Sequence, residues 1–274
     1  MDYNKIIKLV YGARKIAFDQ KLRSDVSLKG KADYVTQADL KISEYIKNGL
    51  RKISPGTAFV TEEEAEHSRA EERFILDPID GTANIVRGYN MSSVSLAHYS
   101  GGDVQFGVVY NLFAEEMFFA IKGRGAYRFD TRGGIRALTA NGIENYRKNR
   151  LHVSDLPPEN AICEFGAGST DKAYADLTFE KARKIFGDCA DLRRICSTAL
   201  SICFIAAGRI DGYFERRIKP WDYAAASLIL TEAGGRLSQW DGTPLPFCEA
   251  STIIAGNEPF YNYLLKTLGN DTTR

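Results

Sequence analysis

Apolar residues recur at helical spacing near the start of the chain. Ile6, Val10, Ala13 and Ala17 lie four, three and four positions apart, which places them on one side of an α-helix. The pattern therefore predicts an amphipathic helix over residues 3–22 that buries one face in the core.

A second helix is predicted after a stretch without periodicity. Residues 27–35 carry lysines around a glycine, a composition typical of a basic loop. Thr36 is a common helix N-cap, and apolar residues follow it at helical spacing as far as Ile53. The Ser-Pro-Gly sequence at 54–56 ends this helix. Two helices thus precede the first strand.

Strand patterns dominate the next part of the chain. Short apolar runs separated by Gly-rich turns predict strands over 58–60, 74–76, 94–99, 106–113, 116–121 and 125–129. Because such short connections join antiparallel neighbours, we expect a largely antiparallel sheet covered by the two helices.

Helices and strands alternate after about residue 150. We expect strands at 161–165 and 212–214, helices at 173–186, 197–207 and 222–233, and short strands at the end. No Pro/Gly/Ser-rich linker separates an N-terminal half, residues 1–150, from a C-terminal half, residues 151–274. We therefore expect one compact α+β unit whose halves share an interface.

Composition and charge exclude several classes of protein. The 274 residues are 44% hydrophobic and 26% charged, as in globular proteins and unlike disordered or fibrous ones. Lys and Arg number 36 against 35 for Asp and Glu, a net charge of +1, so no overall field favours a nucleic acid polymer or an anionic membrane. Five cysteines without a CxxC pair suit reduced thiols. With no signal-peptide pattern at the start, we expect a cytoplasmic protein.

Three carboxylates follow closely on two of the predicted strands. Glu62 comes after the run at 58–60, and Asp77 and Asp80 come after the run at 74–76. If these strands are neighbours, the carboxylates meet at one end of the sheet and repel one another unless a cation neutralises them. Oxygen ligands without nearby His or Cys favour Mg²⁺, Mn²⁺ or Ca²⁺ over zinc.

The segment Asp77–Thr82 adds groups that suit a phosphate. Gly81 allows close approach of the backbone, and the residues after it can begin a helix whose N–H groups favour an anion. The Thr82 hydroxyl can orient a water molecule, and Asp39 on the second helix can accept a proton.

Simpler structural roles also fit these acids. Thr36 to Asp39 matches a helix capping box, and Asp222 can be an N-cap. The glutamates at 62–64 resemble a solvated acidic face, and residues 77–81 can form a turn. An apolar strand followed by two acids three positions apart distinguishes the last segment from an ordinary turn.

Two sequence motifs resemble those of the inositol monophosphatase family in the fructose-1,6-bisphosphatase-like superfamily. The first is Asp-Pro-Ile-Asp-Gly-Thr-Ala-Asn at 77–84, and the second is the segment from Trp221 to Gly235. Residues 34–39, 59–63 and 122–127 are similar to further family segments. The resemblance implies a layered α-β-α-β-α sandwich, often a homodimer, that hydrolyses phosphate monoesters with Mg²⁺ and is often inhibited by Li⁺.

The resemblance also implies roles for individual residues. The implied metal ligands are Glu62, Asp77 and the Ile79 carbonyl for one Mg²⁺, and Asp77, Asp80 and Asp222 for a second. A third, weaker ion would lie near Glu62, and Mn²⁺ can substitute. The implied catalytic residues are Asp39, Thr82 and Glu62. The implied substrate contacts are Asp80, Gly81, Thr82, Cys196, Thr198 and Glu215.

Several alternatives remain at this point. Inositol monophosphate is the expected substrate. Because Cys196 and Thr198 replace smaller residues of the family, the alternatives are fructose 1,6-bisphosphate, 3′-phosphoadenosine 5′-phosphate and histidinol phosphate. An aspartyl-phosphate phosphatase is disfavoured because the two aspartates of that class lie two positions apart, whereas Asp77 and Asp80 lie three apart. A Ca²⁺-stabilised regulatory protein is disfavoured because Asp39 and Thr82 accompany the ligands. We expect metal-dependent attack of water on a small phosphorylated metabolite, with no covalent intermediate.

Overall fold

The central strands of the first sheet are largely buried on both faces. The computed structural model describes residues 1–274 except 31–32, 64–68, 137–148, 169–171 and 270–274. The sheet order is β3-β4-β5-β6-β7-β8, and all neighbours are antiparallel except β3 and β4. Its strands are β3 (Ala58–Thr61), β4 (Arg73–Asp80), β5 (Ser93–Ser100), β6 (Asp103–Asn111), β7 (Glu116–Ile121) and β8 (Gly125–Asp130). The predicted antiparallel character is confirmed.

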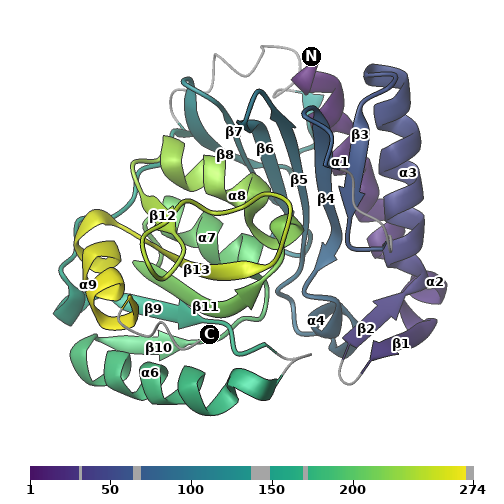
Figure 1. Ribbon diagram of the computed structural model, residues 1–274. Helices are drawn as coiled ribbons and strands as arrows, with labels where there is room; N and C mark the ends of the chain where they lie inside the picture. The colour runs from purple at the N-terminus through teal and green to yellow at the C-terminus, as the bar shows by residue number, and fades with distance from the viewer. Residues whose placement is uncertain (31–32, 64–68, 137–148, 169–171, 270–274) are drawn as a thin grey trace.

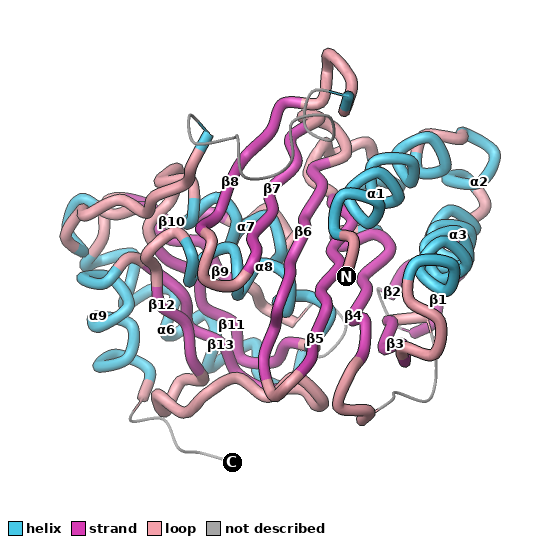
Figure 2. Tube along the Cα trace, turned by 90° about the horizontal axis from the view of Figure 1, so that it is seen from above, coloured by secondary structure: helices cyan, strands magenta, loops and turns pink. Residues whose placement is uncertain are grey.

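Two long helices, α1 (Tyr3–Ala17) and α3 (Gln37–Ile53), cover one face of this sheet (Figures 1 and 2). Phe74 and Leu76 of β4 pack against these helices, whereas Ile75 packs on the opposite face, as the twofold alternation of a strand requires. The first helix is shorter than predicted. It ends at Ala17, and Asp19 then caps the separate helix α2 (Gln20–Ser24).

Two paired strands occupy the described part of the predicted basic loop at 27–35, of which residues 31–32 lie outside the described residues. Strands β1 (Val26–Gly30) and β2 (Asp33–Thr36) pair antiparallel, with Val26 opposite Thr36. The loop prediction was wrong because main-chain pairing, which needs no hydrophobic alternation, forms this hairpin.

The middle layer contains α7 (Thr198–Ala206) and α8 (Pro220–Glu232) (Figure 1). Almost every residue of α8 is buried, as expected for a helix that is apolar on all sides. A side chain at Gly107 of β6 would overlap the Ala225 backbone, so this glycine allows α8 to cross the sheet closely. None of the described helices is long and apolar enough to cross a lipid bilayer.

The second sheet has the order β10-β9-β11-β13-β12. Its strands are β9 (Ile162–Phe165), β10 (Asp191–Arg193), β11 (Gly212–Ile218), β12 (Arg236–Ser238) and β13 (Ser251–Gly256). Helices α6 (Ala175–Asp188) and α9 (Glu258–Leu268) cover its outer face, with short 3₁₀ turns at Pro158–Asn160 and Lys172–Tyr174. The five layers confirm the predicted α-β-α-β-α sandwich. Helix α9 lies near the end of the chain, where only short strands were predicted.

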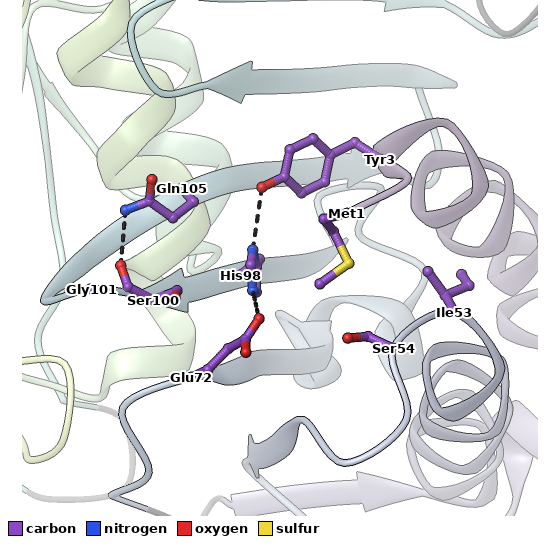
Figure 3. A pocket seen from close by; sticks show the side chains of 9 residues that line it. All are labelled: Met1, Tyr3, Ile53, Ser54, Glu72, His98, Ser100, Gly101 and Gln105. Atoms are coloured by element: carbon purple, nitrogen blue, oxygen red, sulfur yellow. Dashed lines mark hydrogen bonds and ion pairs between the residues drawn. The ribbon is translucent and has the colours of Figure 1, made fainter.

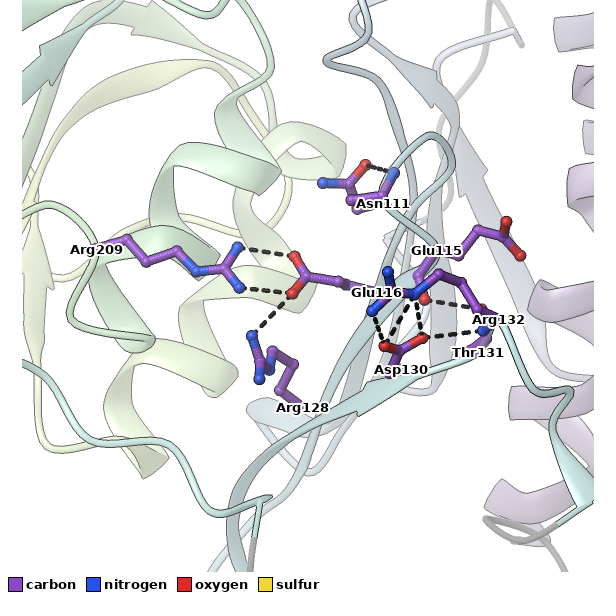
Figure 4. Close-up of polar contacts among 9 residues, drawn as sticks. Asn111, Glu115, Glu116, Arg128, Asp130, Thr131, Arg132 and Arg209 are labelled. Atoms are coloured by element: carbon purple, nitrogen blue, oxygen red, sulfur yellow. Dashed lines mark hydrogen bonds and ion pairs between the residues drawn. The ribbon is translucent and has the colours of Figure 1, made fainter.

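An ion-pair network joins the first sheet to the segment after α7. Arg209 donates two hydrogen bonds to the Glu116 carboxylate, at 2.6 and 2.7 Å, and Arg128 donates a third at 2.9 Å (Figure 4). Bidentate pairing of this kind is stronger than a single exposed contact. Glu116 thus links β7 to the C-terminal half.

Candidate active site

The acids that follow the first two strands lie at one end of the first sheet. Strands β3 and β4 are parallel neighbours, with Thr61 opposite Leu76. Glu62 directly follows β3, whereas Asp77 and Asp80 lie within the last four residues of β4, which extends further than predicted. Parallel pairing therefore brings these three residues to the same edge.

Residues from both halves of the chain line one cavity of about 530 Å³ at this edge. The predicted residues that line it are Glu62, Asp77, Ile79, Asp80, Gly81, Thr82, Cys196, Thr198, Glu215 and Asp222. We call Glu62, Asp77, Asp80 and Asp222 the acidic cluster. Asp39 does not line the cavity; it is 1% exposed and lies behind Thr82.

Burial and mutual repulsion make the acidic cluster unfavourable as four separate anions. Burial, followed by the charges of Glu62, Asp80 and Asp222, raises the pKa of Asp77 well above its ordinary value. Burial raises the pKa of Asp222 in the same way, with further contributions from Asp80 and Glu62. Carboxylates in this situation bind protons or a cation.

The donors of the acidic cluster suit a hard divalent cation. Asp77 is 2% exposed, and its Oδ1 atom is buried without a hydrogen-bond partner among the described residues. Oxygen donors of this kind fit Mg²⁺. Within the described ranges, however, no three His, Cys, Asp or Glu side chains are close enough to form a complete metal cluster on their own. The carboxylates face a shared cavity but do not close around one point.

Asp80 is held by the start of α7. Its Oδ2 atom accepts hydrogen bonds from the Ser197 hydroxyl at 2.6 Å and from the Ala199 N–H at 2.8 Å. Burial still raises its pKa to about 6 in spite of these bonds. The sequence did not identify Ser197 or Ala199; their only signal is a position at the N-terminus of a predicted helix.

Asp39 completes a helix capping box and also contacts Thr82. Its Oδ2 atom accepts hydrogen bonds from the Thr36 N–H at 2.8 Å and the Thr36 hydroxyl at 2.6 Å, which completes the capping box of α3. Its Oδ1 atom accepts a bond of 3.1 Å from the Thr82 hydroxyl. Burial raises the pKa of Asp39 to about 6. Asp39 is therefore a capping residue that also contacts the cavity wall.

Asp222 lies in the first turn of α8 and is not its N-cap. Lys219 occupies the cap position, and its N–H donates a 2.9 Å hydrogen bond to Oδ2 of Asp222. The alternative that Asp222 is the N-cap was therefore wrong, because the cap residue lies three positions earlier. The bond fixes the side chain of Asp222 at the cavity.

The turn after β4 exposes backbone groups to the cavity. Gly81 has a φ of 90°, and a Cβ atom there would lie 2.8 Å from the Met91 carbonyl oxygen. Helix α4 (Thr82–Arg87) begins directly after it, without a side-chain cap. Because the first N–H groups of a helix lack internal acceptors, this turn suits an anion.

Asn84 anchors this turn, a role that the sequence did not suggest. Its Nδ2 atom donates hydrogen bonds of 2.6 Å to the carbonyl oxygens of Met91 and Ile195. Cys196, which follows Ile195, is exposed and has a φ of 57°. Asn84 thus connects the turn after β4 to the segment that precedes α7.

The far side of the cavity contains the remaining predicted substrate contacts. The Tyr213 hydroxyl donates to Oε2 of Glu215 at 2.6 Å and lies 2.9 Å from the Thr198 hydroxyl oxygen. The Gly168 N–H donates to Oε1 of Glu215 at 3.3 Å. A side chain at Gly166 would overlap Glu215, so Gly166 provides the space that this carboxylate occupies.

A second cavity, of about 590 Å³, lies at the N-terminus of α1 and has a different character (Figure 3). His98 lies 3.0 Å from Oε1 of Glu72 through Nε2, and 3.3 Å from the Tyr3 hydroxyl through Nδ1. Glu72 is the only carboxylate among the described residues that line this cavity. The carboxylate chemistry lies in the first cavity.

Comparisons with known proteins find relatives over almost the whole chain. Residues 3–272 match the inositol monophosphatase family. The inositol-1-monophosphatase of Rhizobium meliloti (strain 1021) is 34% identical over 260 residues, which cover 93% of this chain and 91% of the relative. The Nus factor SuhB of Escherichia coli (strain K12) is 32% identical over 249 residues, covering 90% and 86%. The crystal structure of extragenic suppressor protein suhB from Bartonella henselae has a TM-score of 0.83 and 31% identity, covering 98% of each chain.

Proposed function

The chain belongs to the inositol monophosphatase family and is a phosphoric monoester hydrolase of that family, and we propose that it hydrolyses small phosphate monoesters in the cavity lined by the acidic cluster. One observation carries the proposal: four carboxylates from three separate segments line a shared cavity, and one of them, Asp77, has a buried oxygen that finds no hydrogen-bond partner in the described part of the chain.

The acidic cluster would hold Mg²⁺. Glu62, Asp77 and the Ile79 carbonyl would bind one ion, and Asp77, Asp80 and Asp222 a second. When bound, such ions polarise the phosphoryl group, lower the pKa of coordinated water and stabilise charge on the leaving oxygen. The donor set supports this assignment because it consists of oxygens alone.

Thr82 and Asp39 would orient the attacking water and hold its proton. The single proton of the Thr82 hydroxyl is shared between two acceptors, Oδ1 of Asp39 at 3.1 Å and the Ile79 carbonyl oxygen at 3.0 Å. The lone pairs of the Thr82 oxygen would then accept a hydrogen bond from a water molecule in the cavity. A proton that reaches Thr82 can pass to Asp39, whose raised pKa of about 6 suits a group that accepts protons near neutral pH.

The turn at Gly81 would bind the phosphate of the substrate. Gly81 and Thr82 line the cavity. Gly81 is the N-cap of helix α4, and Thr82 is its first residue. Glu215 would accept a hydrogen bond from a hydroxyl of the leaving group, since Tyr213 and Gly168 already orient its two oxygens.

Inositol monophosphate is the reference substrate, because relatives are named inositol-1-monophosphatase. Equally similar relatives carry the name Nus factor SuhB, so the substrate has to be argued from the residues of this chain. Fructose 1,6-bisphosphate, 3′-phosphoadenosine 5′-phosphate and histidinol phosphate are the alternatives. A homodimer and inhibition by Li⁺ are further properties that family membership supports.

The test is phosphate release from these three compounds and from inositol 1-phosphate, each with Mg²⁺ and with Mg²⁺ chelated. Mg²⁺-dependent release from at least one of them is expected. Absence of release from all four at saturating Mg²⁺, by a protein that is folded by circular dichroism, would overturn the proposed function.

A further inference from the structure

A buried glutamate lies between the second sheet and helix α7. Glu164, in β9, is only 3% exposed. Its neighbour Cys163 packs in the outer core with α6 and α9, whereas Ile162 packs in the core shared with α7 and α8. Because side chains alternate along a strand, Glu164 lies on the α7 side of the sheet. A carboxyl group in such a core is unfavourable unless it has hydrogen-bond partners.

Ser201 of α7 is a partner of Glu164. The Ser201 hydroxyl donates a hydrogen bond to Oε2 of Glu164, with an oxygen–oxygen distance of 2.5 Å. It also lies 3.0 Å from the carbonyl oxygen of Ser197, one turn earlier in the chain. Both serines are 1% exposed, so these contacts are shielded from solvent. Glu164 therefore reaches the first turn of α7 through a single side chain.

The first turn of α7 holds Asp80 on its other side. Ser197 is the N-cap residue of α7, but its hydroxyl donates to Oδ2 of Asp80, at 2.6 Å, and not to its own helix. The Ala199 N–H donates to the same oxygen at 2.8 Å. A serine at this position usually fixes the first turn of its helix. Because this hydroxyl is used elsewhere, the turn has no side-chain cap within the described chain, and the pair of Glu164 and Ser201 supports it instead.

We propose that Glu164 is a positioning residue for Asp80. Through Ser201 it fixes the first turn of α7, whose donors hold the Asp80 carboxylate in place. The proposal rests on the proposed function, which assigns Asp80 to the second Mg²⁺. Neither Glu164 nor Ser201 is among the described residues that line the cavity, so both act through Asp80. Loss of the pair should weaken Mg²⁺ binding, because groups that orient metal ligands affect metal affinity.

A purely structural role of the pair would have a different signature. The hydrogen bond between Glu164 and Ser201 would then contribute to the free energy of unfolding but not to the orientation of Asp80. Its removal would lower Tm and leave the Mg²⁺ dependence of phosphate release unchanged. Measuring both quantities on the same variants therefore separates the two roles.

Two variants of Glu164 provide the main comparison. E164L removes the hydrogen-bonding group and keeps a similar size. E164Q keeps that group, and because burial raises the pKa of Glu164, the uncharged amide is a close substitute. With the compound that the wild type hydrolyses fastest, E164L should raise the half-saturating Mg²⁺ concentration roughly threefold to tenfold, less than the 10–100-fold typical of groups that contact a ligand directly. E164Q should behave like the wild type.

Ser201 provides an independent check. S201A should shift the Mg²⁺ dependence in the same direction as E164L. The double variant E164L/S201A should shift it no further than the larger of the two single changes, because both remove the same connection. C163A is the matched control, because Cys163 is buried in the same strand but on the opposite face. It should lower Tm and leave the Mg²⁺ dependence unchanged.

The outcomes distinguish the positioning role from the proposed function. An E164L protein with a lower Tm but the Mg²⁺ dependence of the wild type would overturn the positioning role, and so would an equal shift in E164Q or C163A. If E164L does not fold, S201A decides in the same way. Absence of turnover by the wild type would contradict the proposed function. Calorimetry of Mg²⁺ binding then tests the positioning role alone: weaker binding by S201A than by C163A supports it, and equal binding overturns it.

Discussion

The hydroxyl of Thr82 donates a hydrogen bond of 3.1 Å to Oδ1 of Asp39, which connects the turn after β4 to the first turn of α3. The two residues are 43 positions apart in the chain. The contact places a buried carboxylate directly behind a hydroxyl that lines the cavity. Such an arrangement suits proton transfer away from a water molecule in the cavity.

Replacing Thr82 by Ala should therefore lower the rate of phosphate release and leave Mg²⁺ binding unchanged. We expect kcat to fall by roughly 10²-fold or more, the range of general acid–base contributions, with the Mg²⁺ dependence unchanged. T82S is the matched control, because it keeps the hydroxyl and should retain most of the activity. Steady-state phosphate release measures both. Wild-type kcat in T82A would contradict the role of Thr82.

The raised pKa values predict how the stability of the metal-free protein depends on pH. Asp39 and Asp80 have a pKa of about 6 in the fold, against an ordinary value of 3.8, and those of Asp77 and Asp222 are also raised. The folded state thus binds more protons than the unfolded chain above about pH 4, so these groups lower stability as the pH rises towards neutral.

Binding of Mg²⁺ should offset this loss of stability near neutral pH. The rise in Tm on adding Mg²⁺ is expected to be larger at about pH 7.5 than at about pH 5, because protons compete with the metal for the carboxylates. D222N should shrink the rise, whereas D155N, a change at an exposed aspartate outside the cavity, should not. Thermal unfolding at the two pH values checks this. An equal rise at both would show that Mg²⁺ does not bind the acidic cluster.

Ser197 is expected to position Asp80. S197A removes the 2.6 Å hydrogen bond to Oδ2 and leaves a buried carboxylate with fewer donors, which costs on the order of 1–3 kcal/mol. S93A is the comparison, because its hydroxyl lies 3.5 Å from the same oxygen and contributes less. We expect weaker Mg²⁺ binding by calorimetry in S197A than in S93A. The reverse order would refute the positioning role.

Substitutions at Gly81 and Gly88 distinguish the effect of backbone strain from the effect of steric overlap. Both have positive φ, 90° and 68°, so Ala at either costs about 1–2 kcal/mol. Only at Gly81 would the new Cβ atom lie too close to another atom, the Met91 carbonyl oxygen at 2.8 Å; at Gly88 nothing lies within 4 Å. G81A should lose most of its activity and G88A little. Similar activity in both would show that the Gly81 turn does not bind the phosphate.

Local patterns predicted most of the fold, and the exceptions have physical reasons. The run from Ala58 and the run from Phe74 are neighbouring parallel strands, as the convergence of the acids required. The β1–β2 hairpin was missed because backbone pairing forms it without alternation of apolar residues. Helix α9 was missed although Asn257 caps it and Phe260 and Leu264 have helical spacing.

Contacts between distant segments were beyond the sequence. The motif at 77–84 identified Asp77 and Asp80. It did not predict that Ser197 and Ala199 would donate hydrogen bonds to Asp80. Nor did it predict the hydrogen bond from Asn84 to the Ile195 carbonyl oxygen. These bonds depend on how the middle helices dock on the first sheet, and a serine or a backbone N–H carries no signal of a distant partner.

The most direct test of the account is Mg²⁺-dependent phosphate release by D77N, compared with wild type and D155N. Asn removes one anionic charge at the centre of the acidic cluster and keeps the size of the side chain, so the fold should persist, as circular dichroism would verify. We predict that D77N loses activity by roughly 10³-fold or more, while D155N matches wild type. Release by D77N within a few fold of wild type, at the same Mg²⁺ dependence, would contradict the central claim that these carboxylates act together as the metal-binding site.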